Sequence, residues 1–436
     1  VVMHGADTVA AEVLGLSSQN ATLGHRFLSD GQIVFADADA YAEQMRTQGK
    51  VIASFAERKA AIQAALNEQA GRLNATVAAD EALLDEVTAL VEWPVVLEAG
   101  FEAHFLQVPQ ECLILTMQQN QKYFPLLDAD GKLMSRFLLV SNLQAADPSH
   151  IIHGNERVLR ARLSDAEFFY KQDQKATLES RLPKLENVVY HNKIGNQAER
   201  ISRLTSIAGS IAKALGADVA VAERAARLAK ADLVTEMVGE FPELQGTMGK
   251  YYARLDGESE EIAAAIEQHY QPRFAGDALP EGKIATAVSL ADKLETLVGI
   301  WGIGLVPTGD KDPYALRRAA LGVLRMLMQY DLNAADLIQT AFGSFPSGVL
   351  NPKTPAEVAD FMQARLAVLL QNDYPQDVVA AVLAKAPQRL GDIEGRLNAV
   401  AAFKALPEAA ALAAANKRVH NLLKKADAEL GAVDEG

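Results

Sequence analysis

The sequence predicts an α+β protein, in which a mixed α/β N-terminal body precedes a mostly all-α region. Short strand-like and helical patterns alternate up to about Pro148, and the patterns after that residue are helical. The 436 residues also exceed what one hydrophobic core usually serves, so several domains are expected. We expect a body domain at 1–178, a helical domain at 179–330 and a further helical region at 331–436.

The predicted body begins with strands at 9–16 and 27–36 and a charged, alanine-rich helical stretch at 41–73. Strand patterns return at 91–97, 112–117, 123–127 and 137–140. Between the last two runs, Asp128-Ala129-Asp130-Gly131-Lys132 has the turn chemistry of a hairpin. The body is therefore expected to hold an antiparallel sheet with helices.

The second half begins with an aromatic-rich helix predicted at 155–175. Glycine and proline mark the expected breaks between the later helices, at Gly216, 239–242, 272–280, 307–313, 345–355 and Pro407. No strand is expected in this half.

Composition limits the possible functions. Hydrophobic residues make up 49% and charged residues 22%, which is ordinary for a globular protein. The net charge of −14 argues against indiscriminate binding of nucleic acid, so any such contact must be local. Cys112 is the only cysteine and lies in an apolar run, where a small buried residue is expected.

The sequence shows no run of the ~20 apolar residues that a membrane-spanning helix needs. The opening residues also lack the order of a signal peptide. We expect a cytoplasmic protein without membrane contact. The chain starts without an initiator methionine and ends without a closing element, so we expect a piece of a longer protein.

The first basic cluster lies at 154–170. On a helix Arg157 and Arg160 share a face, so their guanidinium groups could grip adjacent phosphates. The alternative is internal ion pairing with nearby acids, namely Glu156, Asp165 and Glu167. Spacing alone does not separate the two interpretations.

Two further basic segments follow. Thr308 or Asp312 could cap the helix after 307–313, whose N-terminus together with Lys311 would form an anion site. The alternative is a capped helix with solvated arginines, and the spacing excludes an ATP phosphate loop. The stretch 416–425 is the densest basic run, with a solvated amphipathic face as its alternative.

The region 186–297 is similar in layout to metal phosphohydrolases of the HD type, which bind a divalent metal through histidines and aspartates. Asp232 in Ala231-Asp232 and the distant Asp292 match aspartate positions, but Gln197-Ala198-Glu199-Arg200 stands where a first histidine is expected. His191 and His269 lie at the wrong offsets. We therefore expect a degenerate HD-like helical domain with no metal and no catalytic residue.

Eight motifs occur in one order across nearly the whole chain, and together they resemble the beta subunit of bacterial glycyl-tRNA synthetase. The motifs are Gly24-His25-Arg26-Phe27, Val91-Glu92-Trp93-Pro94-Val95, Gln121-Lys122-Tyr123-Phe124-Pro125, Gly154-Asn155-Glu156-Arg157-Val158, Asp165-Ala166-Glu167-Phe168-Phe169, Gln271-Pro272-Arg273-Phe274-Ala275-Gly276-Asp277, Gly309-Asp310-Lys311-Asp312-Pro313 and Asn416-Lys417-Arg418-Val419.

The resemblance implies a ligase of two alpha and two beta subunits, in which the alpha subunit makes glycyl-adenylate from glycine, ATP and magnesium. The beta subunit would hold no cofactor and would supply most of the surface that binds tRNA(Gly). It also implies that 331–436 leads into a truncated anticodon-binding domain. No adenylation signature of a synthetase occurs in this sequence, so the chain is expected to catalyse nothing alone.

Carried over by position, the expected phosphate contacts are basic side chains that position tRNA without reading its bases. These residues are Arg157, Arg160, Arg162, Lys311, Arg317, Arg318, Lys417 and Arg418. Lys122 and Tyr123 are weaker candidates for contact with an unpaired base, and the alternative for Tyr123 is an aromatic residue of the strand core.

Two other classes of function remain open. A metal phosphohydrolase would bind metal at Asp232 and Asp292, and the missing histidines count against it. A non-catalytic helical scaffold would bind no tRNA. The choice of glycine as the amino acid depends on the resemblance alone.

Overall fold

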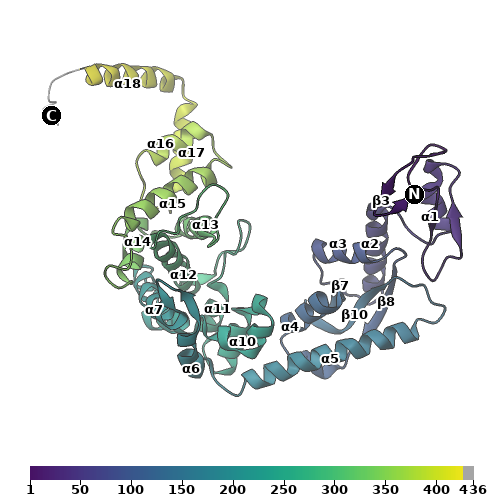
Figure 1. Cartoon of the computed structure of the whole chain (residues 1–436). Helices are drawn as coiled ribbons and strands as arrows, with labels where there is room; N and C mark the ends of the chain where they lie inside the picture. The colour runs from purple at the N-terminus through teal and green to yellow at the C-terminus, as the bar shows by residue number, and fades with distance from the viewer. Residues whose placement is uncertain (426–436) are drawn as a thin grey trace. The chain divides into compact units, whose positions relative to one another are not determined.

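The computed structural model describes residues 1–425 and separates two compact units, Val1–Lys175 and the chain from Ala176 onward. Unit 1 contains most of the strands, and unit 2 is helical apart from one small hairpin (Figure 1). The predicted α+β class is confirmed. The further division of the helical part at residue 330 stays a prediction.

Unit 1 is built on a four-stranded antiparallel sheet in the order β7-β9-β10-β8. Its strands are β7 (Thr76–Val77), β8 (Val95–Gly100), β9 (Phe124–Leu127) and β10 (Leu133–Ser141). The predicted hairpin between β9 and β10 is confirmed, since the Asp128 carboxylate accepts from the backbone N–H groups of Asp130 and Lys132. One face of the sheet packs on α2 (Phe55–Arg72) and α3 (Glu81–Leu90).

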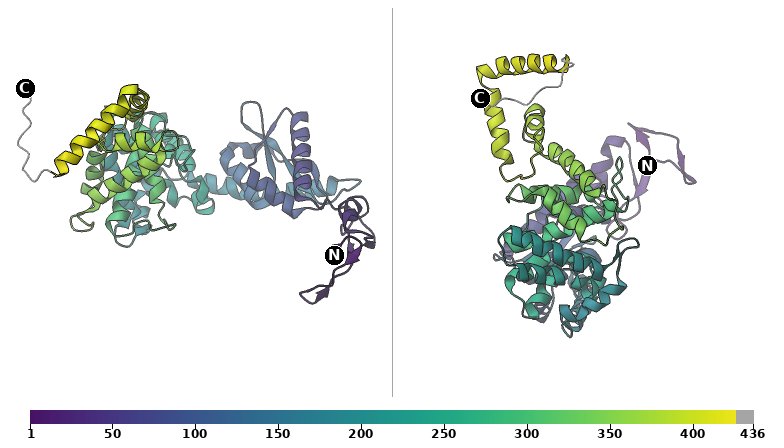
Figure 2. Two further views of the ribbon diagram at one scale, coloured as in Figure 1. Left: turned by 90° about the horizontal axis from the view of Figure 1, so that it is seen from above. Right: turned by 90° about the vertical axis from the view of Figure 1, so that its left-hand side faces the viewer.

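The first predicted strand, 9–16, is wrong because it crosses a turn. Leu14 and Gly15 both have positive φ angles, 52° and 77°, which is the geometry of a tight hairpin turn. The chain therefore forms two short hairpins here, which stand away from the four-stranded sheet in Figure 2. Their strands are β1 (Met3–His4), β2 (Asp7–Thr8), β3 (Glu12–Val13) and β4 (Leu16–Ser17).

The strand predicted at 27–36 is also mostly wrong. Only β6 (Gln32–Val34) is extended, and it pairs with β5 (Ala21–Leu23). The preceding residues turn around buried His25, whose Nδ1 accepts from the backbone N–H groups of Phe27 and Leu28. The helical stretch predicted at 41–73 is divided into α1 (Tyr41–Thr47) and α2.

The apolar run 112–117 forms a helix and not the predicted strand. It belongs to α4 (Gln110–Leu115) and to a π-helical turn, Thr116–Asn120, with Cys112 fully buried. A short apolar run does not distinguish a buried helix from a buried strand, which explains the error. Nearby, β8 begins at Val95 and not at Val91, as Pro94 has no N–H to donate to the neighbouring strand.

The helix α5 (Ser149–Asp173) closes unit 1 and runs along the sheet in Figure 1. Its buried residues include Leu159, Leu163 and Ala166, which recur at helical spacing and define one apolar stripe. Three of the basic residues predicted to bind phosphate, Arg157, Arg160 and Arg162, lie on this helix, off that stripe.

Unit 2 packs around α12 (Gly282–Gly302), which is buried along nearly all of its length. The helices that contact it include α7 (Gln197–Ala214), α8 (Val219–Leu228), α11 (Glu260–Gln268) and α13 (Leu316–Leu327). The start of α7 is fixed by a reciprocal capping box between Asn196 and Glu199. This cap places Arg200 on the first turn, facing α12.

The predicted breaks separate helices of unit 2, but the helices are also interrupted at 256–259, 328–333 and 371–375, where no break is predicted. The remaining helices are α6 (Leu178–Arg181), α9 (Glu236–Glu240), α10 (Thr247–Leu255), α14 (Ala334–Gly343), α15 (Thr354–Leu370), α16 (Gln376–Leu383), α17 (Ile393–Lys404) and α18 (Pro407–Lys425). The expectation that strands end before this half is wrong in one place, where β11 (Val189–His191) and β12 (Gly195–Asn196) form a hairpin that precedes α7.

Among residues 1–425, no single helix is long and apolar enough to cross a membrane. One pair, Ile393–Lys404 with Pro407–Leu423, meets the length and composition criteria together but is bent by 94°.

Candidate functional site

The centre of unit 2 is a buried ionic cluster on α12. The Asp292 carboxylate oxygen Oδ1 lies 3.0 Å from Nη2 of Arg200 on α7 and 3.0 Å from Nζ of Lys230. All three residues are buried. The capping box at the start of α7 and the turn after α8 therefore deliver two cations to one carboxylate.

A second carboxylate extends this cluster by one helical turn. Glu295 is fully buried and accepts from Nε of Arg200 at 3.0 Å and from Nε of Arg203 at 3.0 Å. The guanidinium of Arg200 also lies over the Tyr190 ring, 4.2 Å from its centroid. Each buried charge has a partner, which is the arrangement that burial requires.

The cluster controls the protonation of its members. Burial opposes ionisation of Asp292, but the positive charges of Lys230 and Arg200 outweigh it and hold the pKa of that carboxyl well below its usual range. Burial lowers the pKa of Lys230 to about 8, although the Asp292 carboxylate favours the charged form. Asp292 is therefore a carboxylate at neutral pH.

Asp232 is fully buried and is held by the backbone. Its Oδ2 accepts from the N–H groups of Gly246 at 2.6 Å and Gly249 at 3.1 Å. A Cβ at position 249 would lie only 3.0 Å from that oxygen, so the close approach favours glycine. Burial raises the pKa of Asp232 to about 6, and its Oδ1 has no hydrogen-bond partner within the described residues.

His269 lies in the same cluster despite its unpromising offset in the sequence. Its Nε2 is 2.7 Å from Nζ of Lys230, and its Nδ1 is 2.6 Å from the carbonyl oxygen of Ile266. Burial and the neighbouring Lys230 charge lower the pKa of His269 well below its usual value. A neutral ring that donates from Nδ1 and accepts at Nε2 satisfies both contacts.

These residues do not fit a divalent metal. Arg200 and Lys230 take the Asp292 carboxylate, and Lys230 takes the free nitrogen of His269. Within residues 1–425 no group of three or more histidine, cysteine, aspartate or glutamate side chains is arranged to hold a metal ion. A metal site of the HD type needs a carboxylate that is free to bind the metal, and the carboxylate of Asp292 is already paired with two protein cations.

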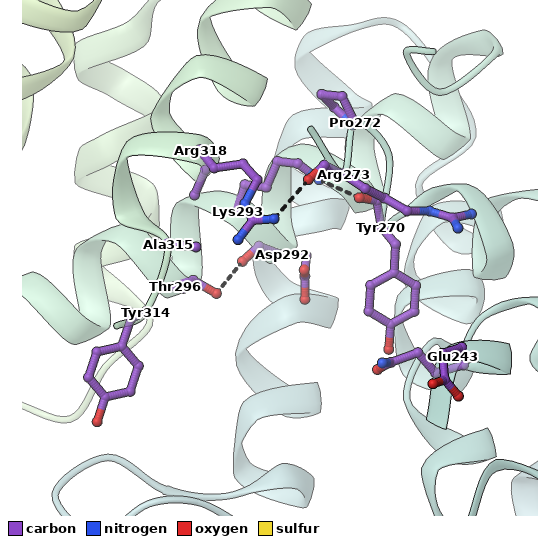
Figure 3. Close-up of a pocket in the computed structure, with 12 residues that line it drawn as sticks. Glu243, Tyr270, Pro272, Arg273, Asp292, Lys293, Thr296, Tyr314, Ala315 and Arg318 are labelled. Carbon is purple, nitrogen blue, oxygen red and sulfur yellow. Dashed lines mark hydrogen bonds between the residues drawn. The ribbon is translucent and has the colours of Figure 1, made fainter. Parts of the chain in front are cut away.

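A pocket of about 340 Å³ opens beside the ionic cluster. Figure 3 shows Asp292, Lys293 and Thr296 on its α12 wall, with Tyr270 and Tyr314 on opposite sides. Arg273 and Arg318 also line it. The pocket thus combines basic and aromatic side chains next to a buried charge network.

The three arginines predicted on α5 all lie on its exposed surface. Arg160 forms an ion pair with Glu102, and not with the acids that the sequence offered as partners. Arg157 and Arg162 form no hydrogen bond or ion pair with the residues that the structure describes. None of the three pairs with Glu156, Asp165 or Glu167, so the partners named in the alternative are wrong, although Arg160 is paired within the chain.

The predicted anion site at 307–318 is occupied by the chain itself. The N-cap position of α13 is Ala315, but the Asp312 carboxylate accepts from the first backbone N–H groups of the helix, Leu316 at 2.8 Å and Arg317 at 2.9 Å, as a capping side chain would. Lys311 is exposed, Arg317 donates to the carbonyl of Gly309, and Arg318 donates to that of Arg273. An anion could therefore contact these basic side chains but not the backbone N–H groups at the start of α13.

The third basic segment lies on α18, where Lys417 and Arg418 are exposed. Neither residue forms an ion pair among the described side chains. Several apolar residues of the same helix are also exposed, including Leu412, Val419 and Leu422. The helix presents both charge and apolar surface to solvent.

Tyr123 belongs to the core and is withdrawn as a base-stacking candidate. The side chain is 5% exposed, its ring stacks on Phe137 at 4.7 Å, and its hydroxyl donates to Asn155 at 2.6 Å. Its neighbour Lys122 is half-buried and pairs with Glu86 at 2.9 Å. The alternative interpretation, an aromatic residue of the strand core, is confirmed.

Sequence reasoning missed the cationic members of the cluster. The sequence pattern shows Arg200 only as part of a segment that lacks an expected histidine, and it assigns no role to Lys230 or Lys293. A signal is present for the two lysines, because Lys230 lies two residues before Asp232 and Lys293 directly follows Asp292 in otherwise apolar segments. Whether such a pair joins an ionic cluster depends on which helices pack together, and residue spacing does not reveal that packing.

Fold and site define a two-unit α+β protein whose helical unit is centred on ionic pairs, with a basic pocket beside them. Residues 1–384 match the model of the family described as glycyl-tRNA synthetase beta subunit, and the chain belongs to that family. It is 83% identical over 435 residues to a protein of Neisseria meningitidis serogroup B named glycine–tRNA ligase beta subunit, covering all of this chain and 63% of that protein.

A protein of the same name from Ralstonia nicotianae is 60% identical over 430 residues, covering 98% of this chain and 61% of that protein. The chain thus spans about three fifths of the length of these relatives. The family resemblance predicted from the eight motifs is confirmed.

Proposed function

We propose that this chain is the tRNA-binding part of a glycine–tRNA ligase beta subunit, which positions tRNA(Gly) for ATP-dependent glycylation on a separate alpha subunit. The observation that carries the proposal is the exposed arginine surface of α5, formed by Arg157, Arg160 and Arg162. In a chain with a net charge of −14, this surface offers local attraction to phosphate without bulk attraction.

The contacts of these arginines leave them available. Arg157 and Arg162 have no partner among the described residues. Arg160 pairs with Glu102, and both side chains of this pair are about half exposed. Exposed pairs of this kind are weak, whereas a guanidinium can form two parallel bonds to a phosphate. Contacts of this kind fix the register of a tRNA and leave base recognition to other groups.

The proposed complex contains two alpha and two beta subunits in the cytoplasm. ATP and magnesium would act at the alpha subunit, and this chain would hold neither a catalytic residue nor a metal. Lys311, Arg317, Arg318, Lys417 and Arg418 are proposed as further phosphate contacts, because their charged groups are open at least in part. In unit 2 the HD-like assignment remains part of the proposal.

Aminoacylation by the full-length protein with its alpha subunit tests this function. The variant Arg157→Ala plus Arg160→Ala should raise the KM for tRNA and leave kcat largely unchanged. Two lost phosphate contacts should also reduce the slope of log affinity against log salt by about 1.5 to 2. The matched control is Arg72→Ala on α2 of the same unit, which removes an exposed arginine paired with Glu68.

If the alpha subunit charges tRNA equally well without this protein, the proposal is wrong. If the double variant behaves like Arg72→Ala, the surface of α5 does not contact tRNA. A non-catalytic scaffold predicts that full-length protein paired with alpha binds no tRNA, so the same assay decides that alternative.

A metal phosphohydrolase is disfavoured by the geometry of the ionic cluster. Such an enzyme needs carboxylates and histidines that are free to bind metal. Asp292 is instead paired with Arg200 and Lys230, and Asp232 is bound by backbone N–H groups.

A further inference from the structure

The pocket beside the ionic cluster is not explained by phosphate contacts on an open surface. It lies between α12, the 243–245 turn, the 270–273 segment and the start of α13, and its volume of about 340 Å³ falls in the range of small-molecule sites. Figure 3 shows labelled side chains from all four segments around it. A site assembled from four segments is suited to enclose a ligand.

The lining carries more positive than negative charge. Three cations line it, Arg273, Lys293 and Arg318, against two carboxylates, Glu243 and Asp292. Asp292 is already paired with Arg200 and Lys230 behind the wall. A ligand in this pocket therefore meets an uncompensated positive charge, which favours an anion.

Lys293 contributes charge but few free donors. Its ammonium donates to the carbonyl of Gln271 at 2.8 Å and to the Ser289 hydroxyl at 3.0 Å, and burial lowers its pKa to about 8. It holds the 269–271 backbone against α12. The direct contacts to an anion must come from the two arginines.

Both arginines have donors to spare. Arg273 is exposed, and its guanidinium has no hydrogen bond or ion pair among the described residues. Arg318 is exposed and uses Nη1 to donate to the Arg273 carbonyl at 3.2 Å. This contact ties Arg318 to the backbone at Arg273 and leaves the other guanidinium N–H groups of Arg318 free for a phosphate.

The aromatic side chains supply a second kind of contact. The Tyr314 ring is 39% exposed and stands edge-on to His191. Tyr270 is fixed by Lys230, whose Nζ lies 4.0 Å from the ring centroid, and its hydroxyl is buried without a hydrogen-bond partner in the described part of the chain. A buried polar group without a partner calls for an explanation, and a ligand atom would provide one.

We propose that this pocket binds a single nucleotide without a metal ion, with the phosphate at Arg318, in the positive field of Arg273 and Lys293, and the base against Tyr314. The Tyr270 hydroxyl forms a hydrogen bond to the same ligand. In this arrangement the positive charge that a metal ion would bring to a phosphate comes from protein side chains. Stacking on Tyr314 adds affinity without selecting one base.

The same chemistry occurs in a free mononucleotide and in an unpaired nucleotide of an RNA. Isothermal titration calorimetry of the full-length protein in a chelating buffer separates the two sources. One arm uses AMP, which carries a terminal phosphate, and the other uses the dinucleotide ApA, which carries a bridging phosphate. Adenosine is the control that lacks the phosphate.

We expect AMP or ApA to bind at least tenfold more tightly than adenosine, and the arm that binds identifies the source. The double variant Arg273→Ala plus Arg318→Ala should weaken that binding at least tenfold. The matched control is Arg396→Ala on α17, an exposed arginine paired with Asp392 outside the pocket, which should leave the affinity unchanged. If neither nucleotide binds, or if the double variant binds as well as wild type, the proposal is wrong.

Tyr270→Phe provides a variant that should keep the fold. Removing a hydroxyl without a protein partner should not lower the midpoint of thermal unfolding, while nucleotide affinity should fall severalfold. Unchanged affinity in this variant overturns the role given to the hydroxyl. The titration contains neither tRNA nor an alpha subunit, so its failure is distinguishable from a failure of the proposed glycylation.

Discussion

The Asp292 carboxylate and the Arg200 guanidinium lie 3.0 Å apart in the buried centre of unit 2. The same guanidinium also binds Glu295 and the hydroxyl of Thr296 one turn further along α12. Arg200 thus joins α7 to α12 through three acceptors. Its charge neutralises both buried carboxylates from within the chain.

We expect Arg200→Gln to lower the free energy of unfolding of unit 2 by about 3 to 5 kcal/mol, since it leaves two buried carboxylates with one cation fewer. Urea denaturation of the full-length protein, followed by circular dichroism, measures the shift. The control Arg254→Ala removes an exposed pair with Glu260 and should cost less than about 1 kcal/mol. A loss in Arg200→Gln no larger than in the control would show that the cluster contributes little to stability.

Because of Asp232, we expect the stability of the fold to depend on pH with a sign opposite to that given by most carboxylates. Burial raises its pKa in the folded protein to about 6, above the ordinary value of 3.8. The folded state therefore binds the proton more tightly than the unfolded state does. Wild-type protein loses stability as pH rises through the window from about 4 to about 6, and the loss is complete above it.

Asp232→Asn cannot ionise and should escape this loss. The free energy of unfolding of the variant should equal that of wild type at pH 4. The variant should become the more stable of the two as pH rises, by on the order of 3 kcal/mol at pH 7, because each pKa unit corresponds to about 1.4 kcal/mol. Urea midpoints of both proteins at pH 4.5 and pH 7 measure the difference. A difference that is the same at both values would mean that Asp232 does not titrate in this range.

Tyr123→Phe separates the structural role of this residue from tRNA contact. The variant keeps the ring on Phe137 and loses the 2.6 Å hydrogen bond to Asn155, so stability should fall by about 1 kcal/mol. Thermal unfolding measures this loss, and aminoacylation with the alpha subunit should show an unchanged KM for tRNA. A raised KM with full stability would restore Tyr123 to the tRNA surface.

Local chemistry was predictable wherever a few neighbouring residues decide the conformation. The Asp128–Lys132 turn, the contacts of Asp312 with the start of α13 and the helix ends at the predicted glycines and prolines follow from residues at set positions. The errors arose where the pattern was ambiguous. The run containing Cys112 is apolar without a clear period, and the predicted strand at 9–16 contains the turn at Leu14 and Gly15.

The sequence alone determined the class, the family and the positions of the exposed arginines on α5, because helical spacing and motif order are properties of the chain itself. Tertiary structure decided which charges meet. Arg200, Lys230 and Asp292 are separated by 92 residues from first to last, and only the packing of α7 and the turn after α8 against α12 makes them one cluster. Burial then fixes their charge states, since a charge removed from water requires a partner at contact distance.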